Sequence, residues 1–355
     1  MKKYKVGIIA KNILNKKRTG IENYTINLLK NFNLNTDYKF IVYINHKYKG
    51  KSNLNNIEFK YLKDKKAWTH TVLYKNIKND NLDLLFSPTP TLPILKLKTK
   101  TIVTVHDLSF KYMKKQIINT TKLFIKKSLN NADQIIAVSK YTKEEIHKTF
   151  NIDLKKITTI YEAYDKNIFY PTNYKGEKDG ITLISIGSIN RRKNITQIVK
   201  ILPILEEKYG NANLIIVGEK GDDFDNLMYT IKDFKLENKV SITGYVSDTK
   251  LKGLIDKSDV LVYPSLEEGF GLPILEGFAS NIPVVTSDNS AMKEIGGRAA
   301  VLIDPKDIFD IANGVIAAIE NHSKLTKLGI IEASKYSWEK TANETLSLFE
   351  KTINS

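Results

Sequence analysis

Two glutamates lie eight residues apart around a glycine-containing stretch, in a segment that reads PSLEEGFGLPILE from residue 264 to residue 276. Glu268 precedes this stretch and Glu276 follows it. Pro273 suits the first position of a helix over 273–279, with Gly271 as its cap. The N–H groups at the start of such a helix favour an anion such as a diphosphate, and they belong to Gly269, Phe270, Gly271 and Leu272. The two carboxylates can then accept hydrogen bonds from a ribose and from a sugar ring, so the segment indicates a nucleotide-sugar site.

Positive charge is expected to reach the same anion from a second loop. A strand-like run over 181–187 ends at Gly187, and Ser188 begins a loop that carries Arg192 and Lys193. Glycine permits close backbone approach to a ligand, and both cations can bind a diphosphate directly.

Another strand-like run, over 239–243, is followed by Gly244 and then by Tyr245 and Val246. Two interpretations stay open for this pair, because glycine after a strand is also ordinary turn chemistry. The two side chains either line the pocket of the nucleotide base or simply turn the chain.

Parallel strands are expected to position these residues, because strand-like runs alternate with amphipathic segments such as Ile21–Phe32 and Thr142–Phe150. The expected strands of the first half are 4–10, 38–44, 83–87, 100–105, 133–138 and 157–161. A polar stretch with proline and glycine at 171–180 is predicted to be a linker. The expected strands after it are 181–187, 213–218, 239–243, 259–263, 282–286 and 299–303.

The alternation predicts an α/β protein with two Rossmann-like, doubly wound domains in tandem. We place the first domain at 1–170, the second at 171–335, and a final helix at 336–355 that packs back on the first domain. Ligands of such sheets bind at the carboxyl ends of the strands, so the expected site is a cleft between the domains.

Composition supports this organisation and limits the alternatives. The chain has 355 residues, which predicts two domains at about 100 to 200 residues per domain. Of these residues 42% are hydrophobic, which is enough to fill both cores. There is no cysteine, which excludes disulfides and thiolate metal sites and favours a reducing cytoplasm. No apolar run approaches the roughly 18 residues of a membrane span, so we expect neither a signal peptide nor an anchor.

The net charge of +16 is concentrated in the first half of the chain. Residues 1–170 carry 33 basic and 13 acidic side chains, a balance of +20, whereas residues 171–355 carry 22 and 26, a balance of −4. One interpretation is a solvated, lysine-rich surface. The other is contact with an anionic membrane surface, for which the segments 60–68 and 111–127 mix lysine with apolar side chains as interfacial helices do. We expect no nucleic-acid partner.

At these residues the chain resembles the retaining glycosyltransferases of family 4, and within them the O-antigen and capsule mannosyltransferases. Glu268 and Glu276 match the family's two glutamates separated by seven residues, in the family's usual setting. The resemblance extends over nearly the whole chain. The other matching segments are Thr19–Glu22, Thr104–Ser109, Ala137–Thr142, Phe169–Pro171, Gly187–Asn194, Ser287–Glu294 and Tyr336–Lys340.

The resemblance implies the GT-B fold, in which an acceptor-binding domain and a nucleotide-sugar-binding domain face each other across a cleft. It implies an enzyme that moves a hexose from a nucleoside diphosphate sugar to a glycan or lipid-linked acceptor during synthesis of a cell-surface polysaccharide, with retention of the anomeric configuration. The implied location is the cytoplasm. Under the membrane interpretation of the basic first half, the enzyme would act at the inner face of the plasma membrane.

Site roles follow from the resemblance residue by residue. Glu268 would contact the donor sugar, Glu276 the ribose hydroxyls, and Arg192 with Lys193 the diphosphate. His106 would lie at the reacting sugar, although a structural histidine at a strand end stays open as the alternative. Gly20 would bring its backbone near a phosphate or the acceptor.

GDP-mannose is the favoured donor, because the RKN sequence of the cationic loop matches the mannosyltransferases, and UDP-linked hexoses come second. Two departures bear on donor preference: Tyr161–Asp165 stands where many relatives have Asn-Gly-Val-Asp, and Ser188 stands where some have arginine. We expect no cofactor and no metal. Asp223 and Asp225 form a DxD pattern but are expected to cap a helix, as is Ser139.

Two other classes of protein fit part of the pattern. A nicotinamide-dependent dehydrogenase also has doubly wound domains, but it requires G-x-G-x-x-G directly after a first strand, and neither Gly7 nor Gly187 begins such a motif. A basic binding protein without catalysis accounts for the charge but leaves the two glutamates and the diphosphate loop without a role.

Overall fold

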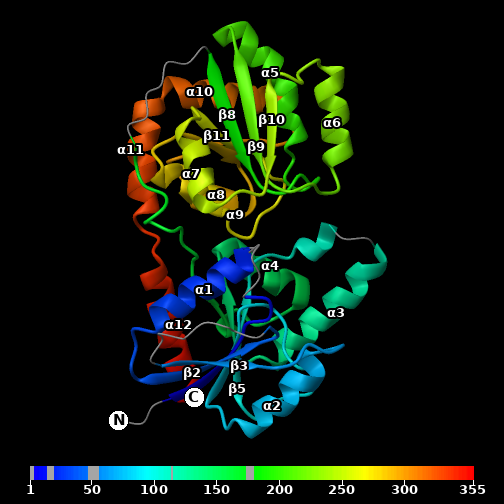
Figure 1. Cartoon of the computed structure of the whole chain (residues 1–355), viewed down its shortest axis with the longest axis vertical. Coiled ribbons are helices and arrows are strands. Elements are labelled where there is room, and N and C mark those ends of the chain that lie inside the picture. Colours follow the sequence, from blue (N-terminus) through cyan, green and yellow to red (C-terminus); the bar gives the residue numbers. More distant parts are fainter. Residues whose placement is uncertain (1–3, 14–19, 47–55, 113–114, 173–179) are drawn as a thin grey trace. The chain divides into compact units, whose positions relative to one another are not determined.

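The computed structural model describes residues 4–13, 20–46, 56–112, 115–172 and 180–355. The chain forms two compact units (Figure 1). Unit 1 comprises Met1–Glu162 and Trp338–Ser355, and unit 2 comprises Ala163–Ser337. Unit 1 therefore ends before the expected boundary at residue 170. The physical reason is that the residues near position 170 make contacts with α7 (Asp248–Asp256) of unit 2. The Lys252 Nζ is 4.9 Å from the centre of the Tyr170 ring, and the Thr172 hydroxyl donates to Asp256 at 2.6 Å.

Unit 1 is built on a parallel seven-stranded sheet with the order β3-β2-β1-β4-β5-β6-β7. Its strands are β1 (Tyr4–Ile9), β2 (Tyr38–Ile44), β3 (Ile57–Tyr61), β4 (Leu84–Ser87), β5 (Lys100–Val105), β6 (Gln134–Ala137) and β7 (Ile157–Thr159). All six expected strands of this half are confirmed, and β3 was missed. The strand β3 lies at the sheet edge, where its exposed Glu58 interrupts the apolar run that marks a buried parallel strand.

Helices of unit 1 cover both faces of this sheet. They are α1 (Gly20–Phe32), α2 (Tyr74–Asn79), α3 (Lys115–Asn131), α4 (Lys140–Phe150) and α12 (Trp338–Ile353), with a π-helical turn at Thr69–Leu73 and 3₁₀ turns at Ser109–Tyr112 and Leu154–Lys156. One core contains Ile8 and Phe86 with residues of α1 and α12, which lie side by side in Figure 1. The other contains Ile9 and Leu85 with residues of α2, α3 and α4. Adjacent strand residues thus face opposite cores, as the alternation of a strand requires.

Unit 2 repeats this plan around a parallel six-stranded sheet with the order β10-β9-β8-β11-β12-β13. Its strands are β8 (Ile181–Ile186), β9 (Ala212–Val217), β10 (Val240–Gly244), β11 (Val260–Tyr263), β12 (Val284–Ser287) and β13 (Val301–Ile303). Its helices are α5 (Thr196–Tyr209), α6 (Phe224–Asp233), α7 (Asp248–Asp256), α8 (Leu272–Ala279), α9 (Ser290–Gly296), α10 (Ile308–Glu320) and α11 (His322–Ala333). All six expected strands of this half are confirmed.

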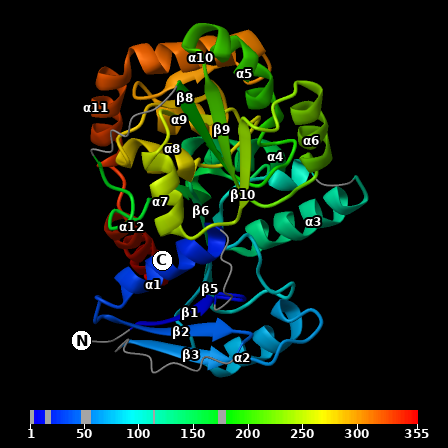
Figure 2. The same ribbon diagram turned by 45° about the horizontal axis from the view of Figure 1, so that its top comes forward.

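The two faces of the second sheet are distinguished by alternate residues of β11. Val260 and Val262 belong to a core shared with α5, α6 and α10, and α5 and α10 lie side by side (Figure 2). Leu261 points to the other face, where α8 approaches so closely that a Cβ on Gly277 would lie 3.2 Å from a Leu261 methyl group and 2.8 Å from Val284. The chain thus passes from the carboxyl end of β11, the neighbour of β8 in the sheet, into α8 on this face.

Candidate active site

The loop after β8 and the loop after β11 bring two cations and one carboxylate together in unit 2. The Lys193 Nζ lies 2.6 Å from Glu268 Oε1, and the Arg192 Nη1 lies 2.6 Å from Glu268 Oε2. All three side chains are largely buried, with 12%, 15% and 8% of the side chain exposed, respectively. Both carboxylate oxygens are thus engaged by cations, and the group of three carries a net charge of +1.

Local backbone geometry explains why the cationic loop reaches Glu268. Gly187 ends β8 with φ +145°, and a Cβ there would lie 3.1 Å from the Lys193 side chain, so glycine leaves room for the lysine stem. The Arg192 carbonyl accepts from the Leu266 N–H at 2.8 Å, which ties the two loops together. Asn194 donates from its amide to the carbonyls of Pro264 and Pro305 at 3.1 and 2.7 Å.

Tyr263 and Asn194 are site residues that sequence reasoning did not assign. The Lys193 Nζ donates to the Tyr263 hydroxyl at 2.5 Å and lies 4.7 Å from the centre of the Tyr263 ring. Burial raises the pKa of Tyr263 well above its ordinary range, so the hydroxyl stays protonated. The only signal for Tyr263 in the sequence was its position as the last residue of a buried strand.

Electrostatics hold Glu268 in its charged form. Burial by itself raises the pKa of this carboxyl, but Lys193 and Arg192 outweigh burial and lower the pKa to about 2. A buried carboxylate is retained only with such partners, because the cost of removing it from water is otherwise prohibitive. Glu268 is therefore an anion at neutral pH.

The start of α8 lies directly after Glu268, and the expected helix is confirmed. Gly271 is the N-cap with φ +101°, a left-handed conformation that favours glycine, and Pro273 lies in the first turn. Phe270 is buried with its ring edge against Tyr336, 6.0 Å between the ring centres. Gly269 is buried and Leu272 is half-buried, so the four residues over 269–272 bring the chain closely around the helix start.

Glu276 lies in the second turn of α8 in a different electrostatic setting. Burial, and secondarily the Asp248 carboxylate, raise the pKa of Glu276 to about 8. Glu276 therefore carries a proton at neutral pH, whereas Glu268 does not. Among the described residues, no cation is placed on Glu276 as Arg192 and Lys193 are placed on Glu268.

We expect the Glu276→Gln substitution to remove a pH dependence of stability. The unfolded carboxyl titrates near its ordinary pKa of 4.5 and the folded one near 8, so between these values only the folded state holds the proton and stability falls as the pH rises. Urea unfolding at about pH 9 should show the wild type less stable than the variant by about 2 to 4 kcal/mol.

Below about pH 4 this difference should disappear, because the Glu276 carboxyl then holds its proton in the unfolded state as well as in the folded state. The matched control is Glu320→Gln, which removes an exposed carboxylate paired with Lys208. A wild-type protein that keeps its full stability at the alkaline end would contradict the raised pKa.

A second ionised pair lies in unit 1, directly after β5. The His106 Nδ1 lies 2.5 Å from Glu162 Oε1, and the Nε2 lies 2.8 Å from the Pro88 carbonyl oxygen. A carboxylate and a carbonyl can only accept, so both ring nitrogens donate and His106 is an imidazolium. Burial by itself lowers the pKa of His106, but Glu162 and the hydrogen bonds raise it above its ordinary value. The Tyr24 ring of α1 packs edge-on against the imidazole at 4.8 Å.

Comparison with known proteins identifies the domains that contain the group of three in unit 2 and the His106–Glu162 pair in unit 1. Residues 170–334 match the profile described as glycosyl transferases group 1, and residues 19–167 match glycosyltransferase family 4. The first half of the chain therefore carries a family 4 glycosyltransferase domain, and the second half carries a group 1 glycosyltransferase domain. The O-antigen chain mannosyltransferase of Salmonella typhimurium is 34% identical over 233 residues, which cover 65% of this chain and 63% of that protein. The O-antigen chain mannosyltransferase B of Escherichia coli is 28% identical over 269 residues, 71% of this chain and 70% of that protein.

Solved structures place this chain in the GT-B fold. Sucrose-phosphate synthase from Thermosynechococcus elongatus superposes with a TM-score of 0.83 at 16% identity, covering 99% of this chain and 100% of that one. At this level of identity the similarity establishes the fold alone. The expected cleft between the two domains stays a prediction.

Other residues predicted to belong to the site of this glycosyltransferase lie as follows. Gly20 is the exposed first residue of α1, and Thr19 before it lies outside the described residues. Ser188 is exposed on the loop that carries Lys193. Tyr245 is 46% exposed and Val246 is half-buried after β10, so the structure leaves both interpretations of this pair open.

Side chains of two predicted helix caps have different partners. The Ser139 hydroxyl accepts from the Thr142 N–H at 3.0 Å, so the cap of α4 is confirmed. Asp223 occupies the cap position of α6, but its carboxylate accepts from the side chains of Thr196 and Asn226 instead of a backbone N–H. Within the described ranges, no three His, Cys, Asp or Glu side chains gather closely enough to hold a metal ion.

The two segments considered for membrane contact differ in the glycosyltransferase structure. Trp68 is 2% exposed, and its indole N–H donates to the Leu62 carbonyl at 3.2 Å, so the prediction that 60–68 forms an interfacial helix was wrong. The Trp68 ring belongs instead to the core that also contains Ile41 and Tyr43 of β2. On α3, by contrast, Leu123 and Phe124 are 66% and 45% exposed. The helices within the described ranges are too short or too polar to cross a bilayer.

We expect Glu162→Gln to convert His106 from an imidazolium into a neutral imidazole. The amide removes the charge that opposes the effect of burial, so the pKa of His106 should fall below its ordinary value of 6.5. Proton NMR titration can follow this, since the chain has only five histidines. The pH profile of sugar transfer should change over the same range. Glu144→Gln on the exposed side of α4 is the control, and an unchanged pKa in Glu162→Gln would contradict the pairing.

Proposed function

We propose that this chain transfers a hexose, with mannose favoured, from a nucleoside diphosphate sugar to a glycan or lipid-linked acceptor, retaining the anomeric configuration. The observation that carries the proposal is the buried group of Arg192, Lys193 and Glu268 next to the glycine-capped start of α8. A helix start and two buried cations suit a diphosphate, and a fixed carboxylate suits the hydroxyls of a sugar.

The proposed roles follow the electrostatic states of the residues. Lys193 and Arg192 stabilise the negative charge that builds on the diphosphate while the bond to the anomeric carbon breaks, which is the main demand of this reaction. Glu268 orients the two cations and accepts from the donor sugar. Glu276 binds the ribose hydroxyls. His106, held as a cation by Glu162, acts at the reacting sugar from unit 1.

Gly187, Ser188 and the residues over 269–272 complete the proposed donor site with their backbone groups. Ser188 is exposed and is therefore available to a ligand, and Gly20 serves the phosphate or the acceptor from unit 1. Tyr245 and Val246 are proposed to face the nucleotide base, which the exposed phenol ring of Tyr245 supports.

Mannose is favoured as the transferred sugar because the Salmonella typhimurium and Escherichia coli relatives are O-antigen chain mannosyltransferases. The aligned part covers 63% of the Salmonella protein, so donor and acceptor are both part of the proposal. GDP-mannose is the first candidate and UDP-linked glucose or N-acetylglucosamine the second.

A donor-hydrolysis screen tests the proposal. The purified chain is incubated with GDP-mannose, UDP-glucose, UDP-N-acetylglucosamine and ADP-glucose, and the released nucleotide is measured. Release from GDP-mannose above the other donors is the expected result. Proton NMR of the first transfer product then shows whether the anomeric configuration is retained. Release from none of the donors, with or without a glycan acceptor, would refute the proposal.

Thermal unfolding with GDP, UDP and NAD separates the transferase from a dehydrogenase. A ligand that binds only the folded state raises its melting temperature, so GDP or UDP should raise it and NAD should not. Stabilisation by NAD alone would favour the dehydrogenase.

We propose further that the basic unit 1 meets the acceptor at an anionic membrane surface, on the cytoplasmic side. The charge balance of +20 over residues 1–170 and the exposed apolar side chains of α3 support this. Sedimentation with phosphatidylcholine vesicles, with and without phosphatidylglycerol, provides the test. Equal recovery in the two supernatants would remove the membrane from the proposal.

A further inference from the structure

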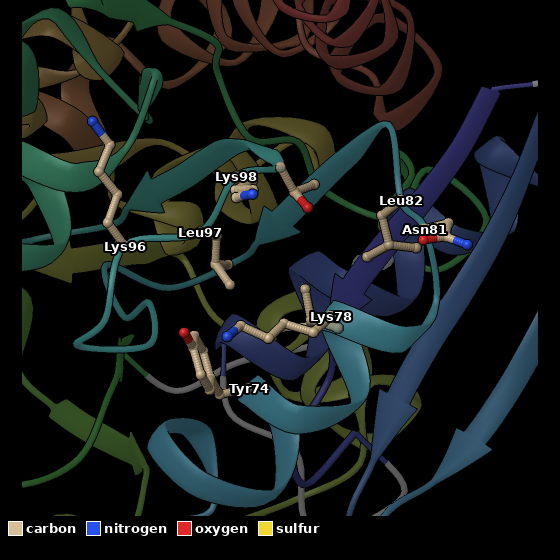
Figure 3. A pocket seen from close by; sticks show the side chains of 9 residues that line it. Tyr74, Lys78, Asn81, Leu82, Lys96, Leu97 and Lys98 are labelled. Atoms are coloured by element: carbon tan, nitrogen blue, oxygen red, sulfur yellow. The ribbon is translucent and has the colours of Figure 1, made fainter.

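Unit 1 contains a cavity of about 570 Å³ that no step of the proposed transfer uses. Residues of α2 line one side of it, and the loop over 96–99 lines the other (Figure 3). Two of the lining residues, Leu82 and Thr99, lie two residues before β4 and one residue before β5, so the cavity lies at the amino ends of these strands. His106 follows the carboxyl end of β5. The cavity is therefore separated from the candidate active-site residues of unit 1 by the length of the sheet.

The cavity combines an apolar floor with a basic rim. Ile77 and Leu82 are buried to 1% and 8% exposure, and Leu97 is half-buried beside them. The rim carries the exposed lysines Lys78 and Lys98, together with Lys96. Among the described residues that line the cavity there is no aspartate or glutamate. The hollow thus presents positive charge without a carboxylate to neutralise it.

Of the three lysines that line the cavity, Lys78 and Lys98 are the two placed to contact a ligand. Figure 3 shows the Lys78 side chain extended toward Tyr74 and facing Leu97, and the Lys78 Nζ lies 4.7 Å from the centre of the Tyr74 ring. Lys98 lies next to Leu97 on the opposite side of the cavity from Lys78, whereas Lys96 extends away from both in this view. An ordinary surface lysine extends into open water, but Lys78 lies along an aromatic ring above an apolar floor.

We propose that this cavity binds a phosphate ester, with the phosphate between Lys78 and Lys98 and an apolar part over Ile77, Leu82 and Leu97. Two lysines without a carboxylate partner match a doubly charged phosphate better than a singly charged carboxylate, because each added charge adds to the attraction. The apolar floor should make the affinity for a phosphate ester higher than that for inorganic phosphate, because only the ester carries a hydrocarbon group that can be buried there.

Apolar side chains also occur in segments next to the cavity lining in the chain. The His70 ring, in the π-helical turn directly before α2, stacks near Phe124 at 6.1 Å between ring centres. Leu123, next to Phe124 in the chain, is 66% exposed, and Leu95, which directly precedes the lining residue Lys96, is 59% exposed. A phosphate ester can come from an anionic lipid headgroup or from a soluble phosphorylated molecule, and the exposed leucines suit the first.

Titration calorimetry of the full chain with hexyl phosphate tests the site. GDP is present in excess, so that a nucleotide site in unit 2 is occupied. The double variant Lys78→Ala/Lys98→Ala should weaken hexyl phosphate binding by about tenfold or more, which corresponds to the loss of a charge-assisted contact. Lys75→Ala is the matched control, because Lys75 is an exposed lysine of the same helix that does not line the cavity. Hexanol and inorganic phosphate should each bind more weakly than hexyl phosphate.

Equal affinity of the double variant and the wild type for hexyl phosphate would overturn the proposal, provided that their circular dichroism melting curves coincide. A second variant, Leu97→Gln, tests the floor without changing charge and should also weaken binding. The outcome does not depend on the donor proposal, because every substituted residue lies in unit 1 and the comparison is between variants under the same conditions.

Vesicle sedimentation distinguishes the two sources of the phosphate ester. If the lipid headgroup is the ligand, Lys78→Ala/Lys98→Ala should lose binding to phosphatidylglycerol-containing vesicles that Lys75→Ala keeps. If a soluble phosphate ester is the ligand, the double variant should lose hexyl phosphate but sediment with vesicles as the wild type does. Both results support the phosphate site and assign its ligand.

Discussion

Replacing Lys193 by methionine is expected to lower donor turnover by a factor of about 100 to 1,000, the usual effect of removing one group that stabilises transition-state charge. Methionine keeps an unbranched apolar side chain against Gly187 and removes the charge together with the hydrogen bonds that Lys193 donates to Glu268 and Tyr263. The Glu268 carboxylate then keeps Arg192 as a partner but loses Lys193 at 2.6 Å. Stability should fall by about 1 to 3 kcal/mol, because one side of a buried carboxylate is left without its charged donor.

Arg191→Met is the matched control for this prediction. Arg191 lies in the same loop but is exposed, and it is held through its backbone N–H to Asp222 at 3.1 Å. Steady-state release of the nucleotide from GDP-mannose measures turnover, and urea unfolding measures stability. If Lys193→Met and Arg191→Met had the same turnover, the assignment of the buried cations to the diphosphate would fail.

The second large effect is expected for Glu268→Gln, in which turnover should fall while the affinity for GDP is kept or increased. The neutral amide leaves the positive charges of Arg192 and Lys193 without their shared anion. An anionic diphosphate then finds a more positive site, so GDP should bind as tightly as before or more tightly. Sugar transfer should fall by about 100-fold, because the two cations and the donor sugar lose the group that orients them.

Calorimetric titration with GDP and steady-state kinetics with GDP-mannose measure the two effects of Glu268→Gln separately. Glu320→Gln, the exposed glutamate in the same unit, should change neither. Weaker GDP binding together with undiminished transfer would show that Glu268 binds the nucleotide and not the sugar.

Acid stability provides an independent test of the same carboxylate. The pKa of Glu268 is about 2 in the folded protein and near its ordinary 4.5 when unfolded, so its contribution is present above pH 4.5 and is lost as the pH falls toward 2. The contribution amounts to about 3 kcal/mol. Glu268→Gln should lack this acid-dependent loss.

Much of the fold could be predicted from local patterns. Twelve strands were expected and are present, because strands buried on both faces of a parallel sheet form apolar runs that stand out between polar helices and loops. The strand β3 was missed because one face at the sheet edge is open to water, so its polar residues conceal it. The cap at Gly271 was also readable, since only glycine adopts φ +101° without strain.

The residues of the candidate site could be predicted from the sequence, but their protonation states could not. Glu268 and Glu276 look alike in the segment 264–276, yet one has a pKa of about 2 and the other of about 8. The difference arises because Lys193, 75 residues earlier in the chain, and its neighbour Arg192 both reach Glu268, whereas Glu276 has Asp248 near it. Such partners depend on which strands are neighbours in the sheet.

The sequence by itself determined the alternation of strands and helices, the family, and the residues that gather at the ends of β8 and β11, because apolar periodicity and turn chemistry act over a few neighbouring positions. Only the tertiary structure decided that Trp68 is buried, that Glu162 holds His106 as a cation, and that Lys78 and Lys98 border one cavity. Burial and pairwise charge depend on distances through space, and residues 56 positions apart in the chain lie within hydrogen-bond distance only after the sheet has formed.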